Sequence, residues 1–291
     1  MFYRIPKFNY YRASTLDEAL DLVSSLNDFK VLAGGTDLVI DLKVRRYTVK
    51  NVVDISRIKE LDYIADDGDR VRIGALTKLQ SIADSPIIRE KVPVLADAVR
   101  EMASWQIRNI ATIGGNLCNA SPAADTAPPL YVLNATLRLV SKEGEREVPI
   151  AEFFLGPRKT ALRSKELLKE IVIPHEPGCG ASFLKLGRRN SFTLSVVAVA
   201  TLVKVVENKF ADVRIALNSV APTPVRARKA EEYLKGKEVS LDNITEAAKL
   251  VLHDISPISD VRASAEYRKD MSVVLTRDSL IKSLERIGIK V

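Results

Sequence analysis

ATIGGNLCNASPAADTAP, residues 111–128, brings paired glycines, small hydroxyls, an asparagine and an aspartate into one short stretch. Gly114 and Gly115 have no side chains, so the backbone there can turn sharply and its N–H groups can approach an anionic ligand closely. We interpret the stretch as a strand and loop that cradle a phosphate-bearing ligand.

A second glycine loop lies upstream. LAGGTDL, residues 32–38, follows an apolar run and precedes VIDLKVRR, which predicts a strand, a glycine turn and a helix N-terminus with free N–H groups. Either loop alone would more often be an ordinary turn. Neither has the Gly-Lys-Ser/Thr of a P-loop or the spacing of the dinucleotide fingerprint. Together the two loops favour one long ligand with a diphosphate.

Length and composition indicate a folded globular protein. The chain has 291 residues, of which 46% are hydrophobic, enough for two or three domains. No apolar run approaches the roughly 20 residues of a membrane span, and the N-terminal stretch lacks a signal-peptide pattern, so we expect a cytoplasmic protein. The net charge of +7 comes from interspersed charges without a basic block. We therefore expect no nucleic-acid partner, and keep a positive face that steers an acceptor as the alternative.

The potentially reactive side chains are few. Cys118 and Cys179 are too few for an iron–sulfur cluster, which needs about four thiolates, and Cys118 is expected to be a buried packing residue. His175 and His253 lie away from the glycine motifs. We assign neither a catalytic side chain nor a metal ligand, as expected where a cofactor carries the chemistry.

Periodicity divides the chain into three parts. We expect a first lobe over residues 1–57, a second over 58–176 and a C-terminal α+β domain over 177–291, beginning in the Pro- and Gly-rich segment 175–182. Helices are predicted at 15–26, 77–85 and 93–104 and strands at 29–32, 51–56 and 169–174, with hairpins at 62–75 and 136–150. The C-terminal part predicts strands at 195–207 and 210–221 and three amphipathic helices at 225–236, 241–255 and 264–288.

With residues 106–135 and LAGGTDL in hand, the chain resembles the FAD-binding subunit of the molybdenum hydroxylases, which include xanthine and carbon monoxide dehydrogenases and aldehyde oxidoreductases. Residues 217–237 and 260–280 are similar to that family's C-terminal flavoprotein domain. The resemblance implies an α+β fold: a two-lobed FAD-binding domain of the type shared with vanillyl-alcohol oxidase-like flavoproteins, plus a C-terminal domain of strands and three helices.

The resemblance also implies the cofactor-binding residues. The phosphates would lie on the first loop, formed by Val31, Leu32, Ala33, Gly34, Gly35, Thr36, Asp37 and Leu38. The flavin and its ribityl chain would lie over Thr112, Ile113, Gly114, Gly115 and Asn116, with Asp125 on sugar hydroxyls. Met102, Leu168 and Lys185 match more distant contacts, and a cation at Lys185 would stabilise the reduced ring. Phe192 or Thr193 stands where some relatives place a tyrosine over the flavin.

The implied function is electron transfer by non-covalent FAD. A large subunit would carry molybdenum-pterin and a small subunit 2Fe-2S clusters, and the FAD would pass electrons to an external acceptor. We favour an aldehyde oxidoreductase, with xanthine and carbon monoxide dehydrogenase open. The alternatives are a free-standing NAD(P)H-dependent flavin reductase and a non-catalytic basic binding module.

Overall fold

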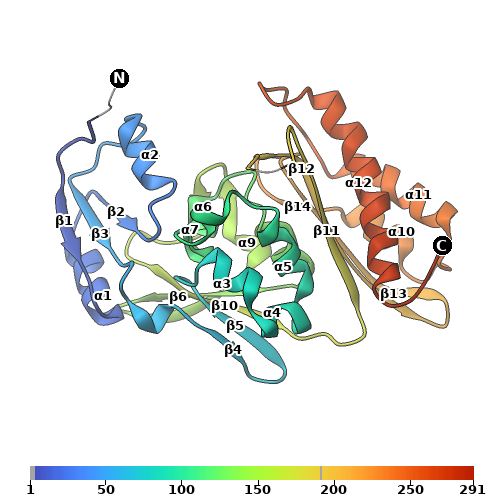
Figure 1. The fold of residues 1–291 in the computed structure, drawn as a ribbon, viewed down its shortest axis with the longest axis horizontal. Helices are drawn as coiled ribbons and strands as arrows, with labels where there is room; N and C mark the ends of the chain where they lie inside the picture. The colour runs from blue at the N-terminus through green and yellow to red at the C-terminus, as the bar shows by residue number, and fades with distance from the viewer. Residues whose placement is uncertain (1–3, 191) are drawn as a thin grey trace.

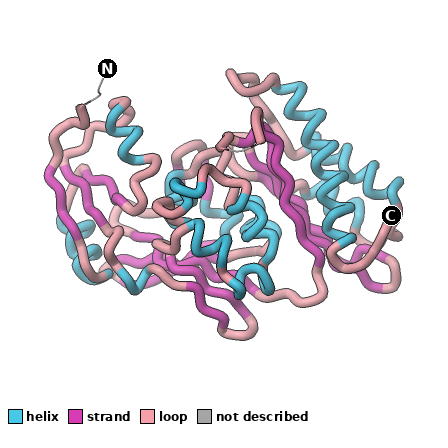
Figure 2. Tube along the Cα trace, in the orientation of Figure 1, coloured by secondary structure: helices cyan, strands magenta, loops and turns pink. Residues whose placement is uncertain are grey.

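The computed structural model describes residues 4–190 and 192–291. Figure 1 shows the chain passing from an N-terminal lobe, through a central sheet and its helices, to a C-terminal sheet backed by further helices. Figure 2 shows that the strands of these three regions belong to separate sheets. This is the α+β architecture that the sequence predicts.

The first lobe is a small parallel sheet with one long and one short helix. Its elements are β1 (Asn9–Arg12), α1 (Leu16–Ser25), β2 (Phe29–Leu32), α2 (Leu38–Lys43) and β3 (Asn51–Asp54). The strands lie in the order β1-β3-β2, with both pairs parallel. Helix α1 begins where the Thr15 side chain accepts a hydrogen bond from the Glu18 N–H, as its N-cap. The predicted helix and strands of this lobe are confirmed.

The second lobe is an antiparallel sheet covered by short helices. The strands are β4 (Ile64–Asp66), β5 (Arg70–Gly74), β6 (Thr136–Ser141), β7 (Gly144–Pro149) and β10 (Leu167–Pro174), with a separate pair β8 (Phe154–Gly156) and β9 (Lys159–Thr160). The helices are η1 (Lys59–Leu61), α3 (Leu79–Asp84), α4 (Pro86–Lys91), α5 (Pro93–Arg100), α6 (Trp105–Arg108), α7 (Ile113–Asn119), α8 (Ala127–Val132) and α9 (Ile150–Phe153). The sheet order β4-β5-β10-β6-β7 contains both predicted hairpins, and places the strand predicted at 169–174 in the centre.

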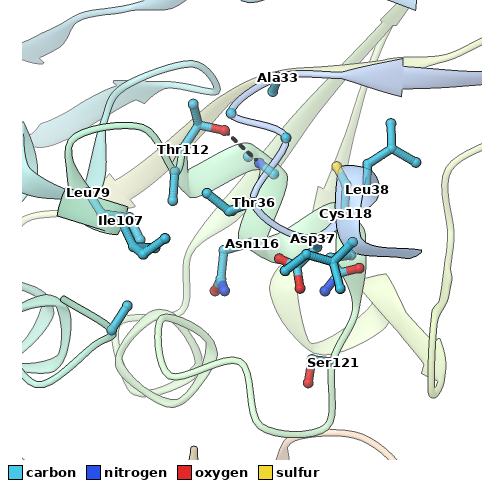
Figure 3. A pocket seen from close by; sticks show the side chains of 18 of the residues that line it. Ala33, Thr36, Asp37, Leu38, Leu79, Ile107, Thr112, Asn116, Cys118 and Ser121 are labelled. Carbon is cyan, nitrogen blue, oxygen red and sulfur yellow. Dashed lines mark hydrogen bonds between the residues drawn. The ribbon is translucent and has the colours of Figure 1, made fainter. Parts of the chain in front are cut away.

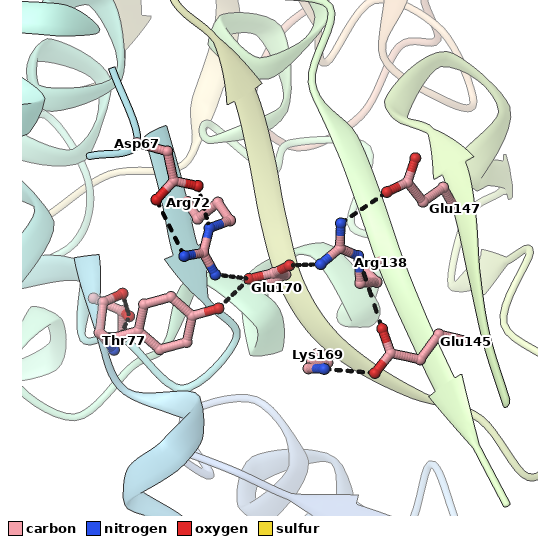
Figure 4. A network of polar contacts seen from close by, with 9 residues as sticks. Asp67, Arg72, Thr77, Arg138, Glu145, Glu147, Lys169 and Glu170 are labelled. Carbon is pink, nitrogen blue, oxygen red and sulfur yellow. Dashed lines mark hydrogen bonds and ion pairs between the residues drawn. The ribbon is translucent and has the colours of Figure 1, made fainter. Parts of the chain in front are cut away.

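A buried carboxylate lies in the middle of this sheet. Glu170 on β10 is 1% exposed, and its oxygens accept from Arg72 on β5 at 3.3 Å and Arg138 on β6 at 2.5 Å, as well as from the Tyr63 hydroxyl. Figure 4 shows Glu170 between the two arginines, each of which also contacts a more exposed acid. Every partner is a hydrogen-bond donor, so both buried oxygens of the carboxylate are paired inside the network.

One local prediction is wrong. The helices predicted at 77–85 and 93–104 are present, and Pro86 and Pro93 each occupy the first turn of a new helix, where proline lacks only an N–H that has no partner anyway. The strand and loop expected at the second glycine motif are helix α7, whose first turn contains Gly114 and Gly115.

The C-terminal region packs helices on one face of a four-stranded sheet. Its elements are β11 (Gly180–Gly187), β12 (Ser195–Val206), β13 (Lys209–Asn218), β14 (Val225–Arg226), α10 (Arg228–Leu234), α11 (Leu241–Leu250), η2 (Val251–His253) and α12 (Ala265–Glu285). Helices α5 and α8 of the second lobe contact the opposite face of this sheet, and one apolar cluster runs from Leu130 to Phe183 and Leu202. The boundaries at residues 57 and 176 remain a proposal.

Helix α12 differs from its prediction. It was expected to be amphipathic, but its buried positions include Arg268, Thr276 and three serines as well as two leucines. Ser279 and Ser283 share hydrogen bonds with Thr201 at 2.8 and 2.7 Å. Hydroxyl pairing therefore replaces much of the apolar contact expected between this helix and the sheet.

In the described residues no helix is both long and apolar enough to cross a membrane.

Candidate functional site

A large cavity lies where the two lobes meet the C-terminal region. Its volume is about 1050 Å³, at the upper end of the roughly 300–1,000 Å³ typical of ligand pockets. It is lined by the first glycine loop, by α7, by Leu168 on β10 and, after β11, by Arg188, Arg189, Phe192, Thr193 and Leu194. A cavity of this volume, lined from all three regions of the chain, fits one large ligand rather than a small substrate.

The first loop presents free backbone donors to this cavity. Gly35 has φ +73°, in the left-handed region that glycine adopts without strain. The N–H groups of Gly34, Gly35 and Thr36 donate to no atom of the described chain. Backbone N–H groups without protein partners in a concave loop are suited to phosphate oxygens.

Gly34 brings the two glycine motifs together. A Cβ on Gly34 would lie 2.3 Å from the Ile110 carbonyl oxygen, so no larger residue fits while the first loop rests on the segment before α7. Figure 3 shows Thr36, Asp37 and Leu38 of the first loop facing α7 across the cavity. The prediction that both motifs serve a single site is thus consistent with their contact.

The second motif does not offer its glycine N–H groups. The Gly114 N–H donates to the Ala75 carbonyl at 2.9 Å, and the Gly115 N–H donates to the Thr112 hydroxyl at 3.0 Å. A Cβ on Gly114 would lie 2.6 Å from the same Ala75 oxygen. The interpretation of these glycines as phosphate donors is therefore wrong, and Gly114 instead allows α7 to pack closely on the end of β5. The free donor here is the Asn116 amide, whose Oδ1 accepts from Thr126 at 2.6 Å while its Nδ2 has no described acceptor.

Asp125 joins the cavity to the C-terminal sheet. Its side chain accepts from Lys185 Nζ at 2.7 Å, from Ser195 Oγ at 2.5 Å and from Asn218 Nδ2 at 2.9 Å, and it is 4% exposed. Lys185 also donates to the Glu101 carbonyl at 3.0 Å. The sequence gives no local signal for Ser195 or Asn218, which are brought to Asp125 only by the tertiary fold.

Most of the predicted site residues line the cavity. Those that do are Val31, Ala33, Gly34, Gly35, Thr36, Asp37, Leu38, Met102, Thr112, Gly114, Gly115, Asn116, Asp125 and Leu168. Three others lie behind this surface. Leu32 packs in the small core of the first lobe, Ile113 is fully buried in the central core, and Lys185 lies behind Asp125. Their roles toward a cofactor remain a proposal.

Four arginines at the cavity were not predicted. Arg158 donates to Asp41 at 2.8 Å and to Asn119 at 2.6 Å, which ties α2 to α7. Arg188, Arg189 and Arg262 line the part of the cavity formed by the C-terminal region. These arginines belong to no recognisable sequence motif. Only the fold shows that they meet at one cavity.

Burial alters two titrating groups in the cavity. Burial raises the pKa of the Asp37 carboxyl, and the nearby Arg158 only partly opposes this effect. Burial raises the pKa of the Cys118 thiol to about 12, so the thiol stays protonated at neutral pH. Cys118 is only partly buried, because it lines the cavity, but it packs against the central apolar cluster, so the expected buried packing residue is found in part.

Comparisons with known proteins cover almost the whole chain. The family model for the FAD binding domain in molybdopterin dehydrogenase matches residues 6–176, and that for the CO dehydrogenase flavoprotein C-terminal domain matches residues 182–283. The chain is 37% identical to the glyceraldehyde dehydrogenase medium chain of Sulfolobus acidocaldarius, covering 93% of this chain and 96% of the relative. It is 33% identical to a xanthine dehydrogenase FAD-binding subunit of Escherichia coli, covering 96% and 97%.

The fold agrees with solved structures. The carbon monoxide dehydrogenase of Hydrogenophaga pseudoflava contains a chain that superposes with a TM-score of 0.94 at 33% identity, covering 97% of this chain and 99% of that one. A quinoline 2-oxidoreductase of Pseudomonas putida gives a TM-score of 0.93 at 26% identity, covering 98% and 100%. The chain therefore belongs to the family of FAD-binding medium subunits of molybdopterin dehydrogenases, which are oxidoreductases.

Proposed function

We propose that this chain binds FAD non-covalently in the 1050 Å³ cavity and works as the electron-transfer subunit of a molybdenum-containing hydroxylase. The observation that carries the proposal is the contact between the two glycine motifs. It places the free backbone donors of the first loop and the residues of the second motif in the same cavity. When bound, FAD supplies the redox chemistry, and the protein supplies binding and orientation.

The residues fit that cofactor. The N–H groups of Gly34, Gly35 and Thr36 would hold the diphosphate, and the Asn116 amide would donate to the polar chain next to it. The Asp125 carboxylate already accepts three hydrogen bonds, so it retains about one of its roughly four acceptor positions for a sugar hydroxyl. Lys185 would act through Asp125 rather than by direct contact.

We propose that the partners are a large subunit with molybdenum-pterin and a small subunit with 2Fe-2S clusters. Electrons would enter from the clusters and leave to an external acceptor. A free-standing flavin reductase is not favoured, since relatives that match over their whole length are named as medium chains or FAD-binding subunits. The cytoplasmic location remains a prediction from the sequence.

The first experiment identifies the chromophore. The purified chain is expected to show a flavin absorbance spectrum, and acid denaturation should release stoichiometric FAD into the supernatant. Protein-bound colour that stays with the precipitate would contradict non-covalent binding. No FAD uptake, together with salt-sensitive retention on polyanions, would instead support a basic binding module.

For the whole complex we propose an aldehyde as the substrate. Support comes from the glyceraldehyde dehydrogenase medium chain, which is 37% identical, against 34% and 33% for two xanthine dehydrogenase subunits and 32% for the carbon monoxide dehydrogenase subunit. The native complex, isolated through this chain and sized, should reduce an artificial dye with aldehydes. Activity with xanthine or carbon monoxide alone would contradict this choice, and a lone chain of monomer mass would contradict the subunit role.

A further inference from the structure

A charged residue is the largest side chain that is fully buried among the described residues. This residue, Arg268 in the first turn of α12, is 1% exposed. Its guanidinium donates to the Val196 carbonyl at 2.5 Å, to the Ser219 carbonyl at 3.0 Å and to Asp260 Oδ1 at 2.7 Å. Its Nε has no partner in the described chain. Because a buried ion pair is often no more stabilising than apolar side chains of similar volume, stability alone does not account for this arginine.

The first backbone acceptor of Arg268 belongs to a β-bulge at the start of β12. The register between β11 and β12 shifts by one residue there, which leaves Val196 without a partner on β11. Side chains alternate between the faces of a strand, and one extra residue reverses that alternation. The bulge therefore turns Ser195 away from Val197, which packs on the α12 side, and toward the second lobe. There the Ser195 hydroxyl donates to Asp125 at 2.5 Å.

The second backbone acceptor lies just after the end of β13. Asn218 is the last residue of this strand, and its side-chain amide donates to Asp125 at 2.9 Å. Ser219 follows with φ +63°, in the left-handed region that non-glycine residues rarely adopt. Its N–H donates to the Pro122 carbonyl at 2.8 Å, and its own carbonyl accepts from Arg268. The buried guanidinium therefore holds the turn that directs Asn218 toward the carboxylate.

Two of the three donors to Asp125 lie in one row across the C-terminal sheet. Lys185 on β11 is paired with Ala198 on β12, which is in turn paired with Asn218 on β13. Paired residues point to the same face of a sheet, so the ammonium and the amide flank the small Ala198 side chain. Ser195 supplies the third donor. With three donors in place, the direction of the remaining acceptor position on this cavity-lining carboxylate is fixed as well.

We propose that Arg268 is a positioning residue for the bound cofactor. It acts through two backbone carbonyls, at the β12 bulge and after β13, and thereby holds the Ser195 hydroxyl and the Asn218 amide against Asp125. In the described structure Arg268 does not line the cavity, so its effect on the cofactor passes through these residues. The inference rests on the proposed function, because it requires Asp125 to accept from a sugar hydroxyl of FAD.

FAD binding to variants of the full chain tests this role. Arg268→Lys keeps a positive charge beside Asp260 but lacks the planar guanidinium that reaches several acceptors at once. Ser195→Ala removes only the hydroxyl that contacts the carboxylate. Each variant should weaken the Kd of FAD about tenfold, as measured by flavin fluorescence, because a hydrogen bond that orients a charged group is lost. At saturating FAD, the visible circular dichroism of the bound flavin should change in the same way in both variants.

The double variant separates positioning from a simple loss of stability. If Arg268 acts through Ser195, adding Arg268→Lys to Ser195→Ala should leave the Kd of FAD well below the roughly hundredfold weakening that independent effects would give. Urea unfolding of each variant measures stability separately. A purely structural role for Arg268 would lower the free energy of unfolding and leave the dichroism of the saturated flavin unchanged.

Two matched controls lie in the C-terminal region away from the cavity. Arg226 is another mostly buried arginine, which donates to Glu231 at 2.5 Å and to the Tyr131 carbonyl at 3.1 Å. Ser182 is another buried serine, and its hydroxyl lies 2.8 Å from the Ser279 hydroxyl. Arg226→Lys and Ser182→Ala should lower stability but leave the Kd of FAD within about twofold.

The outcomes for the two proposals are distinct. A wild-type chain that takes up no FAD would refute the proposed function. Wild-type FAD uptake that neither Arg268→Lys nor Ser195→Ala alters, or losses in the double variant that multiply fully, would overturn the positioning role alone. An unchanged Kd in Ser195→Ala would do so by itself, whatever the stability of Arg268→Lys.

Discussion

At the residue scale, Gly34 is the position where the absence of a side chain allows the two glycine motifs to meet. Gly34→Ala places a methyl group 2.3 Å from the Ile110 oxygen, so the first loop must move away from α7. We expect FAD affinity to fall at least tenfold and stability to fall by about 1–3 kcal/mol. Fluorescence titration with FAD and urea unfolding measure the two effects.

Gly156→Ala is the matched control for Gly34→Ala. Its added Cβ would meet only the Lys159 side chain, at 3.9 Å, and its backbone lies outside the left-handed region. It should leave FAD affinity within about twofold. If both variants bind FAD equally well, close contact between the loops is not what builds the site.

Cys118 provides a second residue-scale prediction. Since burial raises the pKa of its thiol to about 12, only roughly one thiol in ten thousand is ionised at pH 8. Iodoacetamide should therefore leave Cys118 unmodified in the native protein over a time that fully modifies the urea-unfolded chain. Peptide mass spectrometry measures both states, and comparable native and unfolded rates would contradict the burial.

The glycines show what sequence can and cannot predict at this scale. Gly-Gly pairs identify both motifs, and Gly35 does adopt the left-handed backbone expected of a turn. The same pattern at Gly114 serves helix packing, because its neighbour across the fold is the Ala75 carbonyl. A dipeptide fixes the conformations available to the backbone, but not the atom that approaches it.

At the scale of elements, Glu170 holds three strands of the central sheet together. Arg72 and Arg138 are 32% and 28% exposed and each has a second acid, so removal of Glu170 leaves them partly solvated and paired. Glu170→Gln should therefore cost about 1–3 kcal/mol, below the roughly 3–5 kcal/mol of a fully buried broken pair. Urea unfolding measures the loss.

Glu143→Gln is the control, since Glu143 lies exposed in the β6–β7 turn. Its effect should stay within about 0.5 kcal/mol. A similar small effect at Glu170 would mean that the network contributes no net stability.

The segment before α12 carries a pH-dependent contact. Burial acts to raise the pKa of Asp260, but hydrogen bonds from Arg262 and Arg268 outweigh it and hold that pKa well below its usual value. A carboxyl with a lowered pKa contributes stability that is fully present above the unfolded value near pH 4 and is lost as the pH falls below it. Asp260→Asn should therefore lose less stability than the wild type between about pH 6 and about pH 3.

Urea unfolding at the two pH values tests this difference. Asp62→Asn, at an exposed aspartate without an ion pair in the described chain, should keep the wild-type pH dependence. The same pH dependence in Asp260→Asn would show that Asp260 is not held by the arginines.

Helix α12 marks the limit of periodicity at this scale. Its existence follows from the sequence, and in the structure Ser264 caps its N-terminus by accepting a hydrogen bond from the Tyr267 N–H. Its buried side was not predictable from apolar spacing, because Ser279 and Ser283 are buried through hydroxyl partners on other elements. Polar burial depends on partners distant in sequence, which a local pattern does not contain.

At the scale of the whole molecule, Asp125 couples the cavity to the C-terminal region. Its pair with Lys185 is nearly dry, with side chains 6% and 3% exposed. Asp125→Asn would leave the Lys185 ammonium buried without its counter-ion, a loss of about 3–5 kcal/mol. Adding Lys185→Met should recover part of this loss, because the uncompensated charge is then gone. Urea unfolding of the wild type, both singles and the double variant completes the cycle.

Additive losses in that cycle would contradict the coupling.

The fold class, the two motifs and the three C-terminal helices were all predictable, since each depends on spacing or on a family-specific run of residues. The meeting of Ala103 with Phe192 at one cavity was not, because the two residues lie almost ninety positions apart in sequence.

The bridge at Asp125 also has a consequence for recombination among relatives. The C-terminal region looks like an exchangeable module, yet Lys185, Ser195 and Asn218 of that region complete the shell around a carboxylate supplied by the other half. A chimera that imports a C-terminal region lacking these donors would leave the Asp125 carboxylate without hydrogen-bond partners beside the cofactor cavity. We expect such a chimera to keep its stability only where the imported region supplies donors equivalent to these three.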